Sequence, residues 1–314
     1  MDRRRLGPSD LRITRVGVGT WAMGGPDWQR GWGPQDDHDS VAAILRALEL
    51  GVNWIDTAAV YGLGHAETIV AHALAEWRGE RPLVFTKCGL RKDMSGRITV
   101  QLSPESIRFE CDASLRRLGV ETIDLYQIHR PPADLAVLVS AMTELAELRR
   151  RGRVRWIGVS NFTVEQIACA SAIAPVVSLQ PPYSLLDREI EGAILPFCQD
   201  QGIGVIAYSP LASGLLTGTM TRERIAALPD DDWRKHDEEF NEPRLSLHLR
   251  TVEELKAAAE RDGRTPAEAA IAWVLKHPGV TGTIVGVRTA AQADGVMQAF
   301  TRGVTGAGYG HFHS

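Results

Sequence analysis

Several short apolar runs of this sequence end on a polar or ionisable residue. Asp56, Lys87 and His129 each close one such run, and Tyr61 follows Asp56 within the stretch DTAAVYG. Asn161, Gln180 and Tyr208 end or follow later runs. Singly, an Asp or Lys in such a place is usually a cap or surface charge, and a His is usually a hydrogen-bonded core residue. Their repetition is harder to explain that way, because buried charges are costly unless paired.

Four of these residues have the chemistry to deliver a proton together. A phenol has a pKa of about 10 and is a poor acid near neutrality. The ammonium of Lys87 would lower the pKa of Tyr61 by roughly 1–3 units, and Asp56 would hold Lys87 charged and in place. His129 would donate to the substrate oxygen or share the proton. This set predicts proton delivery to a carbonyl oxygen while hydride arrives at the carbonyl carbon.

These side chains meet only if the runs that carry them lie side by side. The sequence contains eight such runs, nearly continuously apolar and bounded by polar residues or glycine, as expected for strands buried on both faces. They are Arg15–Thr20, Asn53–Thr57, Leu83–Lys87, Ile123–His129, Arg155–Ser160, Val176–Gln180, Gly204–Tyr208 and Gly282–Gly286.

Helical patterns with recognisable start and stop signals separate the runs. They are Asp39–Leu50 before Gly51, Ser103–Leu118 with Ser-Pro at its start and Gly119 after it, Thr163–Ile173 with Gln166 in capping-box spacing, a helix that starts at Thr265-Pro266, and a shorter one near Ala290–Phe300. Strict alternation predicts a parallel sheet, and eight units in 314 residues favour a single-domain α/β fold over residues 1–314, a (β/α)8 TIM barrel. The longest irregular region, Ser209–Ser246, is a candidate lid or cofactor clamp over the barrel mouth.

One motif points to a different fold. The stretch GVGTWA at Gly17–Ala22 matches a loose dinucleotide fingerprint, GxGxxA. That fingerprint works only where the glycine turn opens a helix whose N-terminus faces the pyrophosphate. Here MGGPDWQRGWGP follows, which cannot start such a helix. A Rossmann fold is therefore not expected.

Composition excludes several classes of partner. The net charge is −4, with 44% hydrophobic and 24% charged residues, which favours neither nucleic acid nor a membrane surface. The four cysteines form no CxxC pair and are expected to be reduced. The N-terminus lacks the apolar run of a secretory signal, and no run of about 18 apolar residues occurs. We expect a cytoplasmic protein.

The motifs together resemble the aldo-keto reductases, over essentially the whole chain. The matching stretches are VGVGTWAMGG, DTAAVYG, FTKCG, DLYQIHRP, IGVSNF, SLQPPYSLLDR, AYSPLASGLLTG and GTIVGVRTAAQ. The stretch LPDDDWR before the last helices resembles the bacterial branch of the family. The resemblance implies NADPH-dependent reduction of an aldehyde or ketone, with Tyr61 as the general acid in a tetrad with Asp56, Lys87 and His129.

The resemblance also implies the residues that hold an extended nicotinamide cofactor. Thr20 and Trp21 would flank the nicotinamide end together with Asp56, and Tyr208 would stack on the ring. The carboxamide would be held by Ser160, Asn161 and Gln180, the pyrophosphate would be wrapped by Ser209–Leu216 (Ser209, Leu211, Gly214 and Leu216), and the adenosine end would meet Gly286, Arg288, Gln292 and Asp294. Arg288 is the argument for NADPH, because a guanidinium binds a 2′-phosphate bidentately. The alternative is an exposed loop arginine.

The chain also departs from the family pattern. Val296 and Thr219 replace an asparagine and a lysine that many relatives carry near the cofactor. The segment from about residue 301 to residue 314 is glycine-rich, and we expect it to be a flexible tail. Its pair His311 and His313 is weak evidence for a metal.

Other features stay open. Trp28 and Trp32 are either aromatics that cover the core or walls of a substrate pocket. Arg130 either contacts an acidic substrate or caps the barrel. We expect Asp230–Asp232 to be a solvated loop and no metal site.

Two other functions compete with the reductase. The first is an NADPH-binding redox-sensing regulatory subunit with slow turnover, as in some channel-associated relatives. The second, a metal-dependent barrel hydrolase, lacks ligands, because His129 is the single histidine at a strand end. The sequence leaves the carbonyl substrate and the oligomeric state undetermined.

Overall fold

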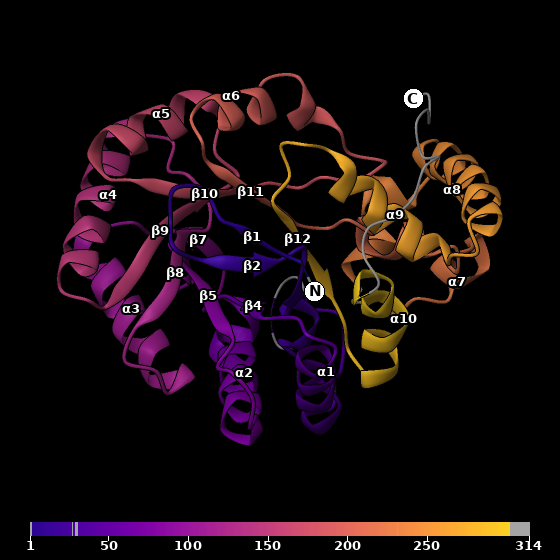
Figure 1. Cartoon of the computed structure of the whole chain (residues 1–314), viewed down its shortest axis with the longest axis horizontal. Coiled ribbons are helices and arrows are strands. Elements are labelled where there is room, and N and C mark those ends of the chain that lie inside the picture. Colours follow the sequence, from indigo (N-terminus) through magenta and orange to yellow (C-terminus); the bar gives the residue numbers. More distant parts are fainter. Residues whose placement is uncertain (1, 27, 29–30, 231, 302–314) are drawn as a thin grey trace.

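A computed structural model of the chain describes residues 2–26, 28, 31–230 and 232–301. Within these residues eight parallel strands close into a barrel in the order β10-β11-β12-β3-β4-β5-β8-β9, with helices around the outside (Figure 1). The strands are β3 Val16–Gly19, β4 Trp54–Asp56, β5 Leu83–Cys88, β8 Ile123–Ile128, β9 Val154–Ser160, β10 Val176–Gln180, β11 Gly204–Ala207 and β12 Gly282–Gly286. This confirms the predicted barrel and excludes the Rossmann fold.

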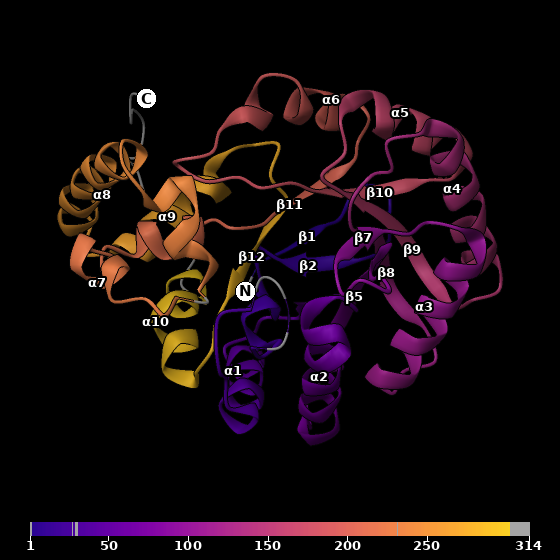
Figure 2. The same ribbon diagram turned by 180° about the vertical axis from the view of Figure 1, so that it is seen from behind.

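The helices follow the strands as the alternation predicts, and Figure 2 shows their ring from behind. They are α1 Asp37–Glu49, α2 His65–Glu76, α3 Pro104–Leu118, α4 Leu135–Arg150, α5 Val164–Ile173, α6 Ile194–Asp200, α7 Arg222–Ala226, α8 Arg244–Arg261, α9 Pro266–Lys276 and α10 Ala290–Thr301. The predicted caps are in place. Ser103 accepts a hydrogen bond from the Ser106 amide, and Thr163 forms a capping box with Gln166.

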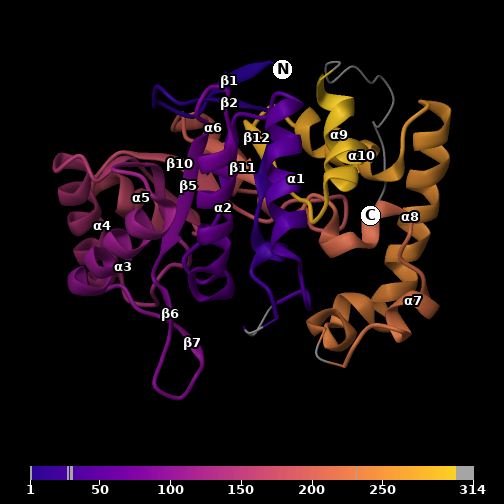
Figure 3. The ribbon, with the colours of Figure 1, turned by 90° about the horizontal axis from the view of Figure 1, so that it is seen from below.

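Two hairpins lie outside the alternation and were not predicted. The strands β1 Arg3–Arg5 and β2 Arg12–Thr14 pair antiparallel, as do β6 Leu90–Lys92 and β7 Ile98–Val100. Figure 3 shows the first hairpin at one end of the barrel and the second extending from the other. Leu6 and Leu11 of the first hairpin pack against apolar side chains inside the barrel, which closes that end.

The expectation of an irregular region over Ser209–Ser246 is partly wrong. Short helical segments occupy much of it, namely the 3₁₀ turns Ala212–Thr217, Trp233–His236 and Glu238–Phe240, the helix α7 and the start of α8. Local caps explain this order. The Thr221 side chain accepts from the Arg224 amide, and the Asp232 side chain accepts from the Arg234 amide.

No helix in the described part of the chain is long and apolar enough to cross a membrane. All four cysteines are free thiols, as expected. Apart from Thr301, which ends α10, the predicted tail lies outside the described residues, as do His311 and His313.

Candidate active site

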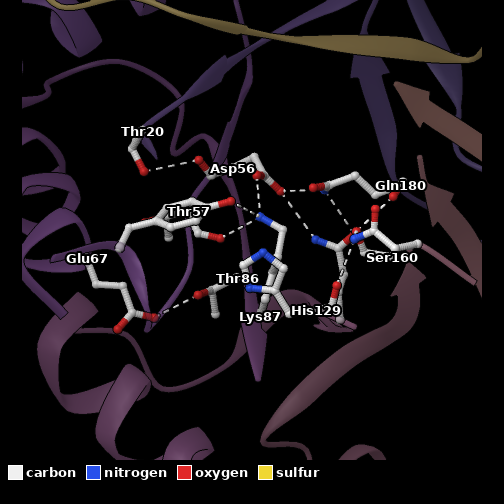
Figure 4. Close-up of polar contacts among 12 residues, drawn as sticks. Thr20, Asp56, Thr57, Glu67, Thr86, Lys87, His129, Ser160 and Gln180 are labelled. Atoms are coloured by element: carbon white, nitrogen blue, oxygen red, sulfur yellow. Dashed lines mark hydrogen bonds and ion pairs between the residues drawn. The ribbon is translucent and has the colours of Figure 1, made fainter. Parts of the chain in front are cut away.

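The four ionisable residues predicted from strand ends come together at the carboxyl ends of the barrel strands. Asp56 ends β4, Lys87 lies one residue before the end of β5, and His129 follows β8 directly. Tyr61 begins the turn that connects β4 to α2. Figure 4 shows Asp56, Lys87 and His129 converging on one point of the mouth.

Lys87 is the centre of this arrangement. Its Nζ donates to Asp56 Oδ1 at 2.5 Å, to the Thr57 carbonyl at 2.9 Å and to the Tyr61 hydroxyl at 3.3 Å. These three acceptors match the three protons of an ammonium. Lys87 and Asp56 are 1% and 2% exposed, so the charge of each is stabilised mainly by the other.

The electrostatics differ in one respect from the expectation for Tyr61. Burial raises the pKa of its phenol and outweighs the opposing effect of Lys87, so the net shift is upward rather than downward. The lowering predicted from the sequence is therefore wrong for this protein, because it ignored desolvation. The consequence is a phenol that holds its proton firmly across the neutral range.

Lys87 and His129 differ in charge at neutral pH. Burial lowers the pKa of Lys87, but Asp56 and Tyr61 together raise this pKa by more than burial lowers it. The net shift is therefore upward. Burial, with smaller effects from Lys87 and Arg130, holds the pKa of His129 well below its usual value. His129 is therefore a neutral imidazole that can donate one N–H, while Lys87 is a cation.

Gln127 completes the site and was missed by sequence reasoning. Its Nε2 donates to Asp56 Oδ2 at 3.3 Å, and Gln180 Nε2 donates to the same oxygen at 2.8 Å. Gln180 Nε2 also donates to Gln127 Oε1 at 3.2 Å. The available signal was a single amide inside the strand IDLYQI, all of whose residues are buried. The two glutamines fix the second oxygen of Asp56.

The residues predicted to hold the carboxamide form one connected chain of hydrogen bonds. Ser160 Oγ donates to the main-chain carbonyl of Gln180 at 2.8 Å, and Asn161 Nδ2 donates to Ser160 Oγ at 3.0 Å. The Tyr208 hydroxyl donates to Asn161 Oδ1 at 2.8 Å. Thr20 Oγ1 donates to the Asp56 carbonyl at 3.2 Å, which places it at the same mouth. Because Gln180 Nε2 donates to Asp56 and to Gln127, the side-chain oxygen Oε1 is the atom of this amide that could accept from a ligand.

A second buried carboxylate fixes the strand that carries Lys87. Glu67 of α2 accepts from Thr86 Oγ1 at 2.7 Å (Figure 4). It also accepts from Arg117 Nε at 2.7 Å. Thr86 directly precedes Lys87, so this contact ties β5 to α2 and α3. Lys87 is therefore held by its backbone as well as by its ammonium.

Aromatic side chains pack against the ring of Tyr61. Trp21 stacks on Tyr61 with centroids 6.2 Å apart, and Trp28 lies 5.7 Å from it. The indole of Trp233 stacks on the other side of Trp21, at 6.3 Å. The structure thus places Trp28 beside Tyr61. The ring of Trp32 lies 4.3 Å from the guanidinium of Arg234, the residue after Trp233.

The segment predicted to wrap the pyrophosphate has an unusual backbone. Ser209, Ala212 and Ser213 have φ of 55°, 45° and 53°, and Gly214 has φ of 104°. Left-handed residues next to right-handed ones direct successive N–H groups to one side, the arrangement found in many anion-binding loops. Leu216 is fully buried, so its side chain belongs to the core, and its backbone N–H donates to the Leu211 carbonyl at 3.2 Å.

The residues predicted for the adenosine end lie together after β12, but their polar groups have partners within the chain. Gln292 Oε1 accepts from the Arg288 amide at 2.8 Å, and Asp294 Oδ1 accepts from Arg46 Nε at 2.8 Å. Gly286 is exposed at the end of β12, with open space where a side chain would be. Arg288 itself contacts the loop before α1.

Three further expectations have mixed outcomes. The solvated loop at Asp230–Asp232 is wrong for Asp232, which is 6% exposed and pairs with Arg234 at 2.7 Å, while Asp230 is exposed and pairs with Lys235. The residues that the structure describes hold no cluster of metal ligands. Arg130 is exposed beside His129, and its role stays a prediction.

The comparisons with known proteins agree with this geometry. The chain is 36% identical over 301 residues to the aldo-keto reductase YhdN of Bacillus subtilis (strain 168), covering 95% of this chain and 88% of that protein. It is 35% identical over 306 residues to the NADH-specific methylglyoxal reductase of Escherichia coli (strain K12), covering 93% and 91%. The solved glycerol dehydrogenase AKR11B4 from Gluconobacter oxydans matches with a TM-score of 0.85 and 39% identity, covering 95% and 90%.

The model of the family described as "Aldo/keto reductase family" matches residues 15–305, nearly the whole chain. With relatives above 30% identity over more than nine-tenths of this sequence, the assignment does not depend on any single motif. The chain therefore belongs to the aldo/keto reductase family, oxidoreductases that act on carbonyl or alcohol groups with a nicotinamide cofactor.

Proposed function

We propose that this protein reduces an aldehyde or ketone to an alcohol with NADPH, and that Tyr61 is the general acid. The observation that carries this proposal is the contact of the buried Lys87 ammonium with both Asp56 and the Tyr61 hydroxyl. A buried cation beside a protonated phenol stabilises the phenolate that remains once the proton has left.

Each residue of the tetrad has a distinct task in this reaction. Tyr61 gives its proton to the carbonyl oxygen, and Lys87 stabilises the resulting phenolate across 3.3 Å. Asp56 keeps Lys87 charged and in place through the 2.5 Å contact. The neutral imidazole of His129, whose pKa burial keeps low, orients the same carbonyl oxygen by donating an N–H. The bound cofactor supplies the hydride.

The residues at the mouth fit a dinucleotide. The side-chain oxygen Oε1 of Gln180 would accept from a carboxamide, since the nitrogen of the same side-chain amide donates to Asp56. The left-handed backbone at Ser209–Gly214 suits a pyrophosphate. Arg288 supports the phosphorylated cofactor, because a guanidinium binds phosphate more strongly than it binds a hydroxyl. The relative from Escherichia coli is named as NADH-specific, so NADH is the alternative to test.

Small oxygenated carbonyl compounds are the first substrates to try. Two relatives are named for methylglyoxal and for glycerol. The indoles around Tyr61 suit both the apolar edge of such a molecule and its hydroxyl groups. We further propose a cytoplasmic location, which the four free thiols support.

The test is the loss of NADPH or NADH absorbance with a panel of carbonyl compounds, including methylglyoxal, glyceraldehyde and an aromatic aldehyde. The proposal expects oxidation that depends on the carbonyl compound, with a higher kcat/KM for NADPH than for NADH. Tight NADPH binding without turnover across the panel would instead support a regulatory, redox-sensing subunit.

A further inference from the structure

The guanidinium of Arg288 is occupied by the loop that connects β3 to α1. Its Nε donates to Gln35 Oε1 at 2.5 Å, and its Nη2 donates to the Pro34 carbonyl at 2.5 Å. Its Nη1 donates more weakly to the Trp32 carbonyl, at 3.4 Å. Gln35 returns a bond from Nε2 to the Arg288 carbonyl at 2.9 Å. Gln35 therefore holds both the side chain and the backbone of Arg288.

The same loop is attached to a third segment of the mouth. The ring of Trp32 lies 4.3 Å from the guanidinium of Arg234. Arg234 is held in turn by two hydrogen bonds to the buried Asp232 carboxylate, at 3.0 and 2.7 Å. Two guanidinium groups thus face one loop, and the Asp232 carboxylate pairs with one of them, Arg234.

This environment favours an incoming anion at Arg288. Burial and the neighbouring Arg234 both lower the pKa of Arg288, while Asp232 opposes them only weakly. The three acceptors of the loop are neutral oxygens. A phosphate carries more charge and accepts two parallel bonds from one guanidinium, so it is the stronger acceptor. To bind it, Arg288 must exchange its bonds to the loop for bonds to the phosphate.

We propose that Gln35 is a specificity-determining residue for the cofactor, because its side chain competes with the 2′-phosphate of NADPH for the Arg288 guanidinium. NADH lacks that phosphate and has nothing to gain from releasing Arg288. Gln35 thereby reduces the preference for NADPH over NADH. This inference rests on the proposed use of NADPH and adds a competitor within the chain.

Two substitutions of Gln35 should act in opposite directions. Gln35→Ala removes the competitor and should tighten NADP⁺ binding about five-fold, the effect of one hydrogen bond. Gln35→Glu places a carboxylate against Arg288 and should weaken NADP⁺ binding by at least that factor. NAD⁺ binding should change little in either variant, so the ratio of the two dissociation constants reports the competition.

The measurement is the Kd of NADP⁺ and of NAD⁺ by titration calorimetry, for the wild-type protein, both Gln35 variants and Arg288→Met. Gln201→Ala is the matched control, because Gln201 is an exposed glutamine at the end of α6, before β11 begins. Arg288→Met should bring the NADP⁺ and NAD⁺ constants together. Gln201→Ala should leave both unchanged.

Competition by Gln35 and the use of NADPH are tested by different variants. If Gln35→Ala and Gln35→Glu weaken both cofactors in parallel, or leave the ratio of the constants unchanged, Gln35 is only structural and this inference is overturned. If Arg288→Met leaves that ratio unchanged, Arg288 does not bind the 2′-phosphate, and the assignment of NADPH falls with the inference.

Discussion

Lys87 places a positive charge where almost no solvent reaches it. Its three acceptors, Asp56, the Thr57 carbonyl and Tyr61, use every proton of the ammonium. Such a pair is weak evidence for stability, since desolvation offsets much of the attraction. In the proposed mechanism its value lies in chemistry, because a cation that is already desolvated would need no reorganisation when the phenol loses its proton.

Gln127 should matter for activity although it lies beneath the reacting atoms. Gln127→Leu removes one donor from Asp56 and one acceptor from Gln180, so both residues lose orientation. We expect kcat/KM to fall about ten-fold, the effect of losing one to two hydrogen bonds. Steady-state kinetics measure this. Ser178→Ala is the control, because the buried Ser178 Oγ has no hydrogen-bond partner in the described structure and its loss should be neutral. Equal effects of both variants would contradict the positioning role.

The sequence predicted the grouping of Asp56, Tyr61, Lys87 and His129 because strand ends are visible as polar residues that close apolar runs. Gln127 was not visible in this way, since it lies inside a strand and its partners come from β4 and β10. The burial of Asp232 was equally hidden. It depends on Arg234 folding back onto Trp32, a loop conformation that no local pattern encodes.

At the scale of elements, α3 supports the end of β5 through one carboxyl group. Glu110 accepts from the Gly89 amide at 3.2 and 3.1 Å and from Ser106 Oγ at 3.2 Å. Gly89 follows β5 directly and has φ of +89°, a conformation that glycine adopts readily. Burial raises the pKa of Glu110 to about 7, despite these hydrogen bonds.

This raised pKa should make stability depend on pH. Between pH 4.5 and about 7 the folded protein keeps a proton on Glu110 that the unfolded chain has released. The contribution is therefore complete below pH 4.5 and is lost as pH rises through 7. Relative to Glu110→Gln, the wild-type free energy of unfolding should fall by on the order of 3 kcal/mol from pH 4.5 to 8. Urea unfolding measures it, and a pH-independent difference would contradict the account.

The turn after Tyr61 is a second element-scale constraint. Gly62 has φ of +58°, and a Cβ there would lie 2.0 Å from the Gly24 carbonyl oxygen. Gly62→Ala should therefore separate the two loops, displace Tyr61 and cost more than about 2 kcal/mol. Gly25→Ala is the control, with φ of +74° but no atom within 4 Å of its Cβ. The Tm of thermal unfolding and kcat should both fall much further for Gly62→Ala than for Gly25→Ala. Similar losses in the two variants would contradict this view.

The positions of the barrel strands could be predicted from the sequence. Every barrel strand lies within a residue or two of its predicted range, because strands buried on both faces are continuously apolar. The first hairpin was missed since β1 is Arg3–Arg5, three exposed arginines without alternation. Its order comes from the apolar residues between the strands, which pack inside the barrel.

At the scale of the whole molecule, the two ends of the barrel have separate tasks. One end is closed by the β1–β2 hairpin, whose Leu6, Leu11 and Ile13 are buried against strand residues such as Trp54 and Phe85. The other end carries the tetrad. In barrels of this type, the first end serves stability and the second serves chemistry.

Leu11→Ala should therefore separate stability from activity. Leu11 is 1% exposed, and truncating such a side chain costs about 2–5 kcal/mol. We expect a lower Tm with kcat unchanged at temperatures where the protein is folded. Leu247→Ala, on an exposed part of α8, should change stability by about 0.5 kcal/mol or less. A loss of kcat in Leu11→Ala without unfolding would contradict the separation of the two ends.

The central claim is that Tyr61 donates the proton. Its most direct test compares the wild-type protein with Tyr61→Phe in NADPH-dependent reduction of a carbonyl compound, with NADPH binding measured in parallel. The ring packing against Trp21 and Trp28 is kept, and only the hydroxyl 3.3 Å from Lys87 is removed. The account predicts a fall in kcat of about 10²–10⁴ with NADPH affinity retained. A variant that keeps kcat near that of the wild-type protein would contradict it.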